Sequence, residues 1–209
     1  MPTTNSPTNR RQNKAEIARS PEGAIKGLAE TAVSKARGPA PVHLWNPPDC
    51  GDIDMRIAAD GTWFYCGSPI GRLPLVQLFS SILRKDGDRY VLVTPVEKVG
   101  VRVDDAPFLA VELHVEEADG GSRLTFRTNV EDQVTVDERH PLRFERDAAE
   151  GLKPYVRVRG DLWALVKRAL YYDLVDLGVT ERRGEGAWFG VRSSGAFFPM
   201  CPVSEIEGL

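Results

Sequence analysis

The sequence predicts an α+β protein made of two small mixed domains with antiparallel sheets. Apolar and polar residues alternate through much of residues 98–136, which is the period of half-buried strands. Two other segments, Leu75–Leu83 and Trp163–Leu177, repeat apolar residues at helical spacing. A chain of 209 residues with 42% hydrophobic residues can bury one medium core or two small ones. We expect a disordered tail at residues 1–20, an N-terminal domain at 21–95 and a C-terminal domain at 96–209.

The N-terminal half alternates short strands with helices. Asp60-Gly61 has the composition of a tight hairpin turn. Pro74 suits the first turn of a helix, and Gly87 suits the end of one. The elements expected in order are a weak helix at 21–37, strands at 52–57 and 63–66, an amphipathic helix through 75–83 and a strand at 90–93.

The C-terminal half begins with an antiparallel meander over residues 98–136. Asp161 is a good residue for a helix N-cap and Gly178 for the end of a helix, so one long helix is expected between them. Ser193-Ser194-Gly195 is typical of a hairpin turn. The remaining strands are expected at 142–144, 155–158, 188–191 and 196–198.

Two breaks interrupt the alternation, at Thr94–Lys98 and at Asp104–Phe108. Pro95 has no N–H group, so it ends a ladder or lies at a sheet edge. We expect the chain to leave the N-terminal domain at the first break and to form a returning hairpin at the second. Turn residues at a domain junction are also candidates for lining a cleft.

An offset of ninety residues brings similar residues of the two halves together. Tyr65 then meets Tyr155, Leu73 meets Trp163, and each half reads strand, turn, helix, strand. The matched residues are generic core types, so a true duplication and a chance similarity are both open.

Composition excludes several classes of function. The formal net charge is −3 and the pI is about 5.7, which gives no general attraction to nucleic acid or anionic membranes. Three scattered cysteines predict neither a disulfide framework nor a metal site. With no apolar signal segment and no apolar run of spanning length, a cytoplasmic protein is expected.

The chain contains no sequence motif that identifies a reaction. It has no Walker A loop, G-x-S-x-G elbow or dinucleotide-binding fingerprint. Asp52 and Asp54 are two apart on a predicted strand and therefore share a face. His140 precedes a proline in a loop and is the most notable of three histidines. These three residues define a hydrolase alternative, although no third acidic partner lies near the two aspartates.

An anion site is better supported by the sequence. "GSPIGR" places Ser68 and Arg72 just before a helix, where free backbone N–H groups and positive potential favour phosphate or carboxylate. The same residues also make an ordinary turn and cap. Arg157 and Arg159 share a strand face in the second half, where they can reach a ligand or pair with acidic residues of the same chain.

Several long blocks resemble the bacterial domain-of-unknown-function family DUF1285. They include "NPPDCGDIDMRIAADGTWFYCGSPIGR", "YVLVTPVEKVGVRVDDAPF", "PYVRVRGDLWALVKRALYYDLV" and "GVRSSGAFFP", and they cover roughly residues 45–199. The resemblance implies two small α+β domains, the second superficially like a pleckstrin-homology barrel. It also implies a nucleotide-like ligand at the interface between them and a role in signalling, with no established activity.

The leading hypothesis is a ligand-binding or sensory module for a small anionic, nucleotide-like molecule in an interdomain cleft. We expect cations to contact its negative groups, other polar residues to orient it and one aromatic ring to stack on it. The alternatives are a protein-interaction module with a purely structural charge network, and the hydrolase. No cofactor or metal is expected, and the sequence does not define the oligomeric state. The candidate ligand residues are Ser68, Arg72, Thr94, Glu97, Lys98, Asp105, Phe108, His140 and Arg157.

Overall fold

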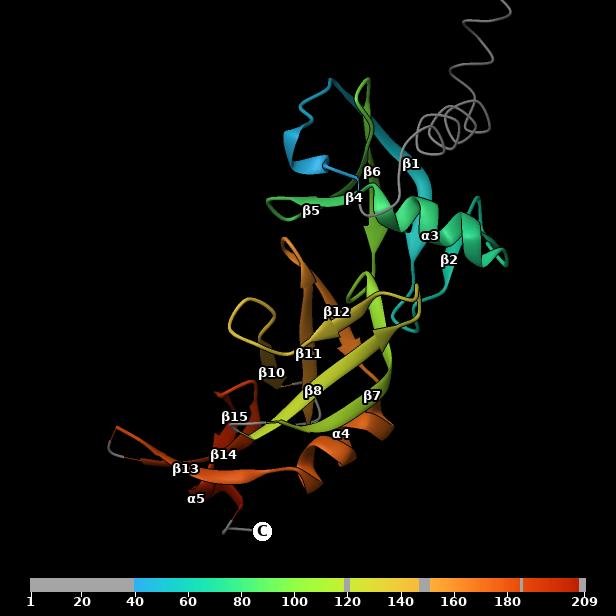
Figure 1. The fold of residues 1–209 in the computed structure, drawn as a ribbon. Coiled ribbons are helices and arrows are strands. Elements are labelled where there is room, and N and C mark those ends of the chain that lie inside the picture. Colours follow the sequence, from blue (N-terminus) through green and yellow to red (C-terminus); the bar gives the residue numbers. More distant parts are fainter. Residues whose placement is uncertain (1–39, 119–120, 147–150, 185, 207–209) are drawn as a thin grey trace, which may run out of the picture. The chain divides into compact units, whose positions relative to one another are not determined.

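The computed structural model describes residues 40–118, 121–146, 151–184 and 186–206 (Figure 1). The expected tail at 1–20 and helix at 21–37 lie outside this range. The described chain is mostly β with few helices, and it forms two compact units. The first unit contains residues 40–56 and 63–102, and the second contains 57–62 and 103–206.

The first unit is built on a six-stranded sheet with the strand order β3-β2-β1-β6-β5-β4. One α-helix, α3 (Leu73–Ser81), and one short 3-10 helix, η1 (Val42–Leu44), accompany it. The strands are β1 (Asp49–Ile57), β2 (Trp63–Tyr65), β3 (Ser68–Pro69), β4 (Leu83–Asp86), β5 (Arg89–Val93) and β6 (Lys98–Val103).

Helix α3 confirms the helix expected from the apolar spacing, except that it ends at Ser81: Leu83 begins β4, and Gly87 lies in the β4–β5 turn instead of ending the helix. Its Val76 and Phe79 are buried, and Pro74 lies in its first turn, where no backbone N–H is needed. The Phe79 ring stacks on that of Trp63 of β2, with centroids 6.4 Å apart. This contact places the apolar face of the helix against the sheet.

The first break in the alternation is a turn within one sheet. The Thr94 N–H donates to the Glu97 carbonyl at 2.9 Å, and β6 then runs antiparallel to β5. The prediction that the chain leaves the first sheet here is therefore wrong, and the meander expected from Lys98 begins only at β7. Local alternation identified β6 as a strand but carried no information about which sheet it joins.

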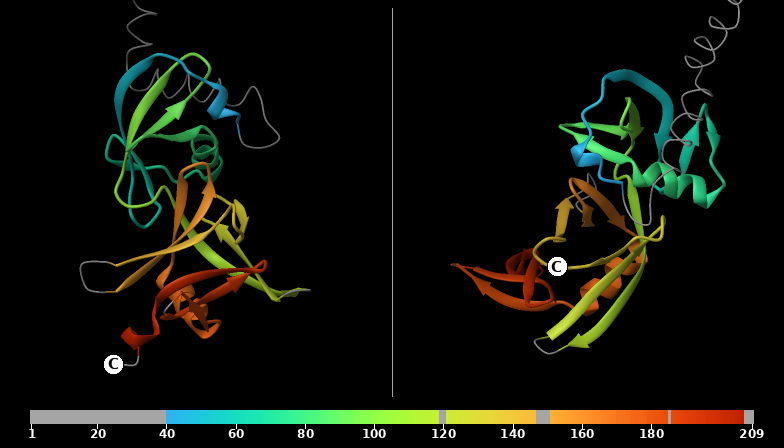
Figure 2. Two further views of the ribbon diagram at one scale, coloured as in Figure 1. Left: turned by 90° about the vertical axis from the view of Figure 1, so that its left-hand side faces the viewer. Right: turned by 45° about the horizontal axis from the view of Figure 1, so that its top comes forward.

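The second unit contains a curled six-stranded sheet with the order β10-β11-β12-β7-β8-β9, seen from two further sides in Figure 2. Most neighbours are antiparallel, but β12 runs parallel to β7. The segment 104–107 joins β6 of one sheet to β7 of the other, so it is not the hairpin expected from the sequence. The strands are β7 (Phe108–Ala118), β8 (Gly121–Thr128), β9 (Gln133–Thr135), β10 (Leu142–Arg146), β11 (Leu152–Arg159) and β12 (Leu162–Val166).

A three-stranded antiparallel sheet and two helices complete the second unit. Its last two strands confirm the hairpin expected around Ser193-Ser194-Gly195. Helix α4 packs beside β7 and β14, and α5 packs beside β14 and β15. Their bounds are β13 (Val179–Arg183), β14 (Gly186–Ser193), β15 (Ala196–Pro202), α4 (Arg168–Asp176) and α5 (Val203–Ile206).

The long helix expected from Asp161 to Gly178 is wrong in its first part. Leu162, Ala164 and Val166 are buried and alternate with the more exposed Trp163 and Leu165, which is the pattern of a strand. This segment is β12, paired on both sides, and α4 begins only at Arg168 with Lys167 as its N-cap. A short apolar run satisfies both periods, so pairing in the folded protein decided its structure.

The proposed duplication is not confirmed. At an offset of ninety residues, Leu73 and Val76 of α3 fall on Trp163 and Val166 of β12. A helix thus matches a strand, and the similarity of the residues reflects their shared apolar character.

Candidate functional site

The residues of "GSPIGR" form an exposed turn ahead of α3. Ser68 lies in β3 opposite Tyr65, and Arg72 is the N-cap residue of α3, without a side-chain capping bond. Both residues are exposed. The structure therefore leaves both candidate anion ligands accessible. Ser68 lies in the strand that precedes the helix, and only Arg72 lies at the start of the helix itself.

Thr94 and Glu97 close the β5–β6 turn. Thr94 is 1% exposed, and its hydroxyl donates to the Glu97 carbonyl at 3.1 Å and accepts from the Glu97 N–H at 3.2 Å. These bonds occupy the polar atoms of Thr94. Its demonstrated contacts are those of a turn residue.

Lys98 belongs to a charge cluster of the first unit. Its Nζ donates to Asp86 at 3.1 Å, and the guanidinium of Arg84 donates to the same carboxylate at 2.6 and 2.9 Å. Arg84 also donates to the carbonyls of Val42 and Trp45, which ties η1 to β4. The hydrogen bonds from Arg84 and Lys98 hold the pKa of Asp86 below its usual value, against the opposing effect of burial.

Replacing Asp86 with asparagine is expected to weaken the acid sensitivity of folding. A carboxyl with a depressed pKa contributes stability that is present above its unfolded pKa of about 3.9 and is lost as the pH falls below it. Asp86→Asn should cost about 1 kcal/mol at pH 7 and less at pH 3. Urea denaturation at both pH values measures this, with the exposed neighbour Asp88→Asn as the control. An equal loss at the two pH values would contradict the assignment.

Asp105 lies in a second charge cluster, in the second unit. It accepts a hydrogen bond from the Tyr155 hydroxyl at 2.8 Å and another from Lys153 Nζ at 3.1 Å. Burial and the bond to Asp105 raise the pKa of Tyr155, so the hydroxyl stays protonated and continues to donate. Asp105 therefore pairs within its own unit.

A cluster of cations and aromatic rings lies on the same face of the second sheet. Arg143 of β10 stands opposite Tyr155 of β11, and its guanidinium lies 5.0 Å from the Tyr155 ring centroid and 4.2 Å from that of Trp163 on β12. Arg157 is opposite Trp163 and two residues from Tyr155, so it shares this face. We name Arg143, Tyr155, Arg157 and Trp163 the outer-face cluster.

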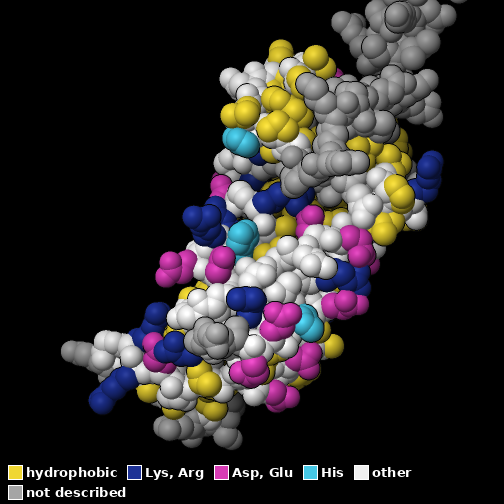
Figure 3. Space-filling model, in the orientation of Figure 1, with side chains coloured by type: hydrophobic (Ala, Val, Ile, Leu, Met, Phe, Trp, Pro, Cys, Tyr) yellow, Lys and Arg dark blue, Asp and Glu magenta, His cyan; other side chains and the backbone are white. Residues whose placement is uncertain are grey.

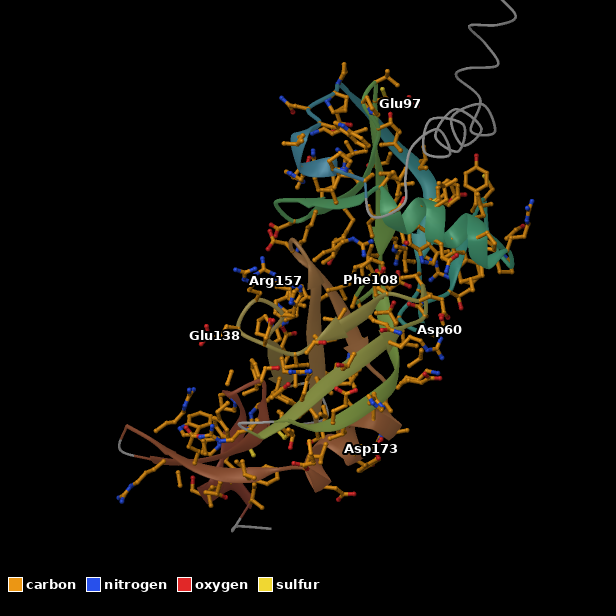
Figure 4. All side chains as sticks on the ribbon, viewed as in Figure 1. Asp60, Glu97, Phe108, Glu138, Arg157 and Asp173 are labelled. Carbon is orange, nitrogen blue, oxygen red and sulfur yellow. The ribbon has the colours of Figure 1, made fainter. Side chains whose placement is uncertain are left out.

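Arg157 is partly exposed and its ion pair is weak. Its Nε donates to the Gly160 carbonyl, and its nearest carboxylate contact is Asp161 at 3.5 Å. The Arg157 side chain is 38% exposed and that of Asp161 is 75% exposed, so solvent screens the pair. Figure 4 labels Arg157 on β11. Of the cations predicted to bind a ligand, Arg72 and Arg157 both remain accessible, and Lys98 is held by Asp86.

His140 and Phe108 are placed less favourably for a ligand. The His140 ring and backbone N–H both bond to Asp137, and the backbone hydrogen bonds from His140 and Arg139 help to hold the pKa of Asp137 below its usual value against burial. Phe108 is 1% exposed, and the guanidinium of Arg159 lies 4.9 Å from its ring centroid. In this structure Phe108 stacks on an arginine.

The groups named for the hydrolase alternative do not assemble a metal site. Asp52 pairs with Arg89, which also pairs with Asp49. Within residues 40–206, apart from the gaps in the described chain, no group of three or more His, Cys, Asp or Glu side chains is arranged to hold a metal ion.

The same part of the chain has no helix with the length and apolar character needed to cross a membrane.

A charged groove of about 670 Å³ runs along β7, β8 and β9. Figure 3 shows acidic and basic side chains interspersed over the part of the second unit that carries β7 and β8. Arg127 pairs with both Glu112 and Glu131, and its hydrogen bond lowers the pKa of Glu112. Because Arg127 is held by two carboxylates and is 30% exposed, against 45% for Arg143, this groove is a weaker candidate than the outer-face cluster.

The sequence missed Arg143 and Trp163 as neighbours. The sequence predicts a helix at Trp163, and a helical Trp163 would not lie beside a strand that carries arginine. One local signal was available: "LRF" and "YVRVR" both alternate basic and apolar residues, which predicts cations on one face of each strand. Which strands pair, and therefore which cation meets which ring, appears only in the folded sheet.

The fold and these clusters define a two-domain, β-rich protein. Comparison with protein-family models matches residues 40–106 to the N-terminal domain, and residues 107–200 to the C-terminal domain, of a family of unknown function, DUF1285. The chain belongs to the DUF1285 family, as its resemblance to that family predicted. No curated protein matches the chain.

Two solved structures are similar to this protein, and both are described as DUF1285 family proteins. One, from Silicibacter pomeroyi DSS-3, is 54% identical in sequence to this protein. The match covers 86% of this chain and 97% of the other chain, with a TM-score of 0.77. The other, from Shewanella baltica OS155, is 32% identical, covers 59% of this chain and 91% of its own, and has a TM-score of 0.48. The first of these supports the family assignment over most of the described chain.

Proposed function

We propose that the protein binds a small anionic, nucleotide-like ligand at the outer-face cluster, and that this binding serves a sensory role. The observation that carries the proposal is the Arg143 guanidinium lying 4.2 Å from the Trp163 ring centroid while its side chain remains 45% exposed. The expectations that Arg72 and Lys98 contact the same ligand, and that the ligand lies between the domains, remain predictions. The pleckstrin-homology-like character of the C-terminal half is a further part of the proposal, supported by its curled sheet.

The stacked arginine is suited to bind phosphate. A guanidinium that lies over an aromatic ring can still form paired bonds with phosphate oxygens through its N–H groups. The indole ring of Trp163, which is partly exposed, adds flat apolar surface beside the charge, whereas the Tyr155 ring is only 4% exposed and contacts the guanidinium from within the fold. A ligand with a planar base and a phosphate matches this combination.

Competing carboxylates limit which anions can bind. Arg143 pairs with Glu145 at 3.2 Å, and Lys153 pairs with Asp105 at 3.1 Å. Arg143 and Glu145 are 45% and 49% exposed, so their pair is weak and exchangeable, whereas Asp105 is only 16% exposed and holds Lys153 more firmly. A phosphate with nearly two negative charges competes with such partners better than a single carboxylate does.

The alternative of a purely structural charge network predicts a different outcome. In that case each cation is satisfied by its own carboxylate, and its replacement changes stability without changing affinity for any small molecule. Measuring both quantities on the same variants separates the two functions.

The proposal is tested by thermal shift of the full chain with nucleoside mono-, di- and triphosphates, cyclic nucleotides and inorganic phosphate. A nucleotide at about 100 times its dissociation constant stabilises the folded state by about 2.7 kcal/mol, which raises the melting temperature by several degrees. Arg143→Gln or Arg157→Gln should each weaken that binding about tenfold.

Arg192→Gln is the matched control for these two variants. It removes an exposed arginine that is paired with Glu181 elsewhere in the second unit. Its affinity should equal that of the unaltered protein. The proposal fails if no phosphorylated compound shifts the melting temperature, or if both cluster variants bind as tightly as the control.

A further inference from the structure

The second unit contains a further cavity. It lies at the end of β11 that begins with Leu152, whereas Arg157 lies near the other end of that strand. Its volume is about 730 Å³, within the range of about 300–1,000 Å³ that is usual for small-molecule sites. We name it the C-terminal pocket, because residues of α4, β14, β15 and α5 line it together with the ends of β10 and β11.

The C-terminal pocket is separate from the outer-face cluster because of the pleat of β10. Arg143 and Arg146 are three residues apart on this strand, so their side chains leave opposite faces of the sheet. Arg143 stands opposite Tyr155, whereas Arg146 stands opposite Leu152, which lines the pocket. A ligand on one face therefore does not contact the arginine of the other.

The interior of the pocket is apolar. Leu152, Val175, Phe189, Met200 and Ile206 come from five different elements and all line it. Burial raises the pKa of the neighbouring Cys201 thiol, so this group stays neutral at physiological pH. An apolar body of a ligand can occupy this space without displacing charge.

One charged pair lies among the lining residues. Arg146 forms an ion pair with Glu205 of α5, and the two side chains are 55% and 43% exposed. An exposed pair of this kind contributes little stability, so it can open at small cost. The Tyr171 hydroxyl is a further polar group of the lining, and burial raises its pKa so that it remains a donor.

The geometry points to a binding site for an amphiphilic monocarboxylate such as a medium-chain fatty acid, with its apolar body in the C-terminal pocket and its carboxylate on Arg146. Glu205 already holds a carboxylate against Arg146, so the position of the anionic head is defined by the protein itself. A ligand that takes this position releases Glu205 to solvent. Apolar lining and a single cation together select a chain with one negative end.

Methionine methyl groups provide a direct probe of occupancy. The chain has three methionines; Met200 lines the pocket and Met55 is buried in the first unit. In the full chain with 13C-labelled methionine methyl groups, dodecanoate below its micelle concentration should shift the Met200 resonance in a saturable manner. The Met55 resonance should stay in place.

Two variants test the role of the charged pair. Arg146→Gln should weaken dodecanoate binding about tenfold, because the head group loses its cation. Glu205→Gln should strengthen it about two- to fivefold, because the competing carboxylate is gone. Glu181→Gln, which breaks the ion pair with Arg192, is the control and should leave the affinity unchanged.

Three results would overturn the inference. They are an unmoved Met200 resonance, equal binding of dodecanoate and dodecanol, and preference for the cationic dodecyltrimethylammonium, which would assign the head group to Glu205. None of these results bears on nucleotide binding at the outer-face cluster, so the two proposals fail independently.

Discussion

Replacing Ser193 with alanine is expected to lower the free energy of unfolding of the second unit by about 2–4 kcal/mol. The Ser193 hydroxyl is fully buried, donates to the Val136 carbonyl at 2.7 Å and accepts from the Leu124 N–H at 3.0 Å. Alanine removes both bonds and leaves two buried backbone groups without these partners. Each such group costs about 1–3 kcal/mol.

The Ser193 result has a local as well as a global measure. Urea denaturation gives the loss of stability, and hydrogen exchange at the Leu124 amide should accelerate because its acceptor is gone. Ser194→Ala is the control. Ser194 is exposed, and because serine and alanine both carry a Cβ, the substitution does not change the backbone strain at its positive φ of 52°. Unchanged exchange at Leu124 together with an unchanged denaturation midpoint would show that the hydroxyl is not structural.

Replacing Gly190 with alanine is expected to cost about 3 kcal/mol. A Cβ at this position would lie 2.3 Å from the Phe198 carbonyl oxygen and 2.9 Å from the Pro199 Cα, both backbone atoms. The ladder of β14 and β15 shifts between Phe189 and Gly190, and the glycine allows the two backbones to approach at this bulge. Because backbone atoms cannot rotate away, the strands must separate.

Gly186→Ala in the same strand provides the matched comparison for Gly190. There an added Cβ would come no closer than 3.9 Å, to the Trp188 indole nitrogen. We expect this variant to be neutral or slightly stabilising, because alanine reduces the freedom of the unfolded chain. Similar denaturation midpoints for the two variants would contradict the role assigned to the bulge.

Local pattern predicted much of the secondary structure. The apolar spacing of α3, the alternation in β7 and β8, and the turn residues between β14 and β15 each produced the expected element. In these segments one period fits and the other does not, so the pattern is unambiguous. The family assignment also followed from the sequence, because long ordered blocks are far more specific than any single motif.

The candidate site was predicted only in part. Arg157 and Asp105 were identified as charged residues near a ligand or an ion pair, and the structure shows their partners to be Asp161, Tyr155 and Lys153. Arg143 was not identified. Its importance depends on strand pairing between β10, β11 and β12, and a sequence pattern that assigned β12 to a helix could not indicate that pairing.

By itself the sequence determined the family of this protein. It also determined local features: the strands with a period of two, the first amphipathic helix, and the turns formed by polar and glycine residues. Only the tertiary structure decided that β6 joins the first sheet, that residues 162–166 form a strand, and that Ser193 bonds to the backbone of Leu124 and Val136. The physical reason is the range of the interactions. Periodicity and turn chemistry act over a few residues, whereas sheet pairing and burial join residues tens of positions apart and depend on the whole fold.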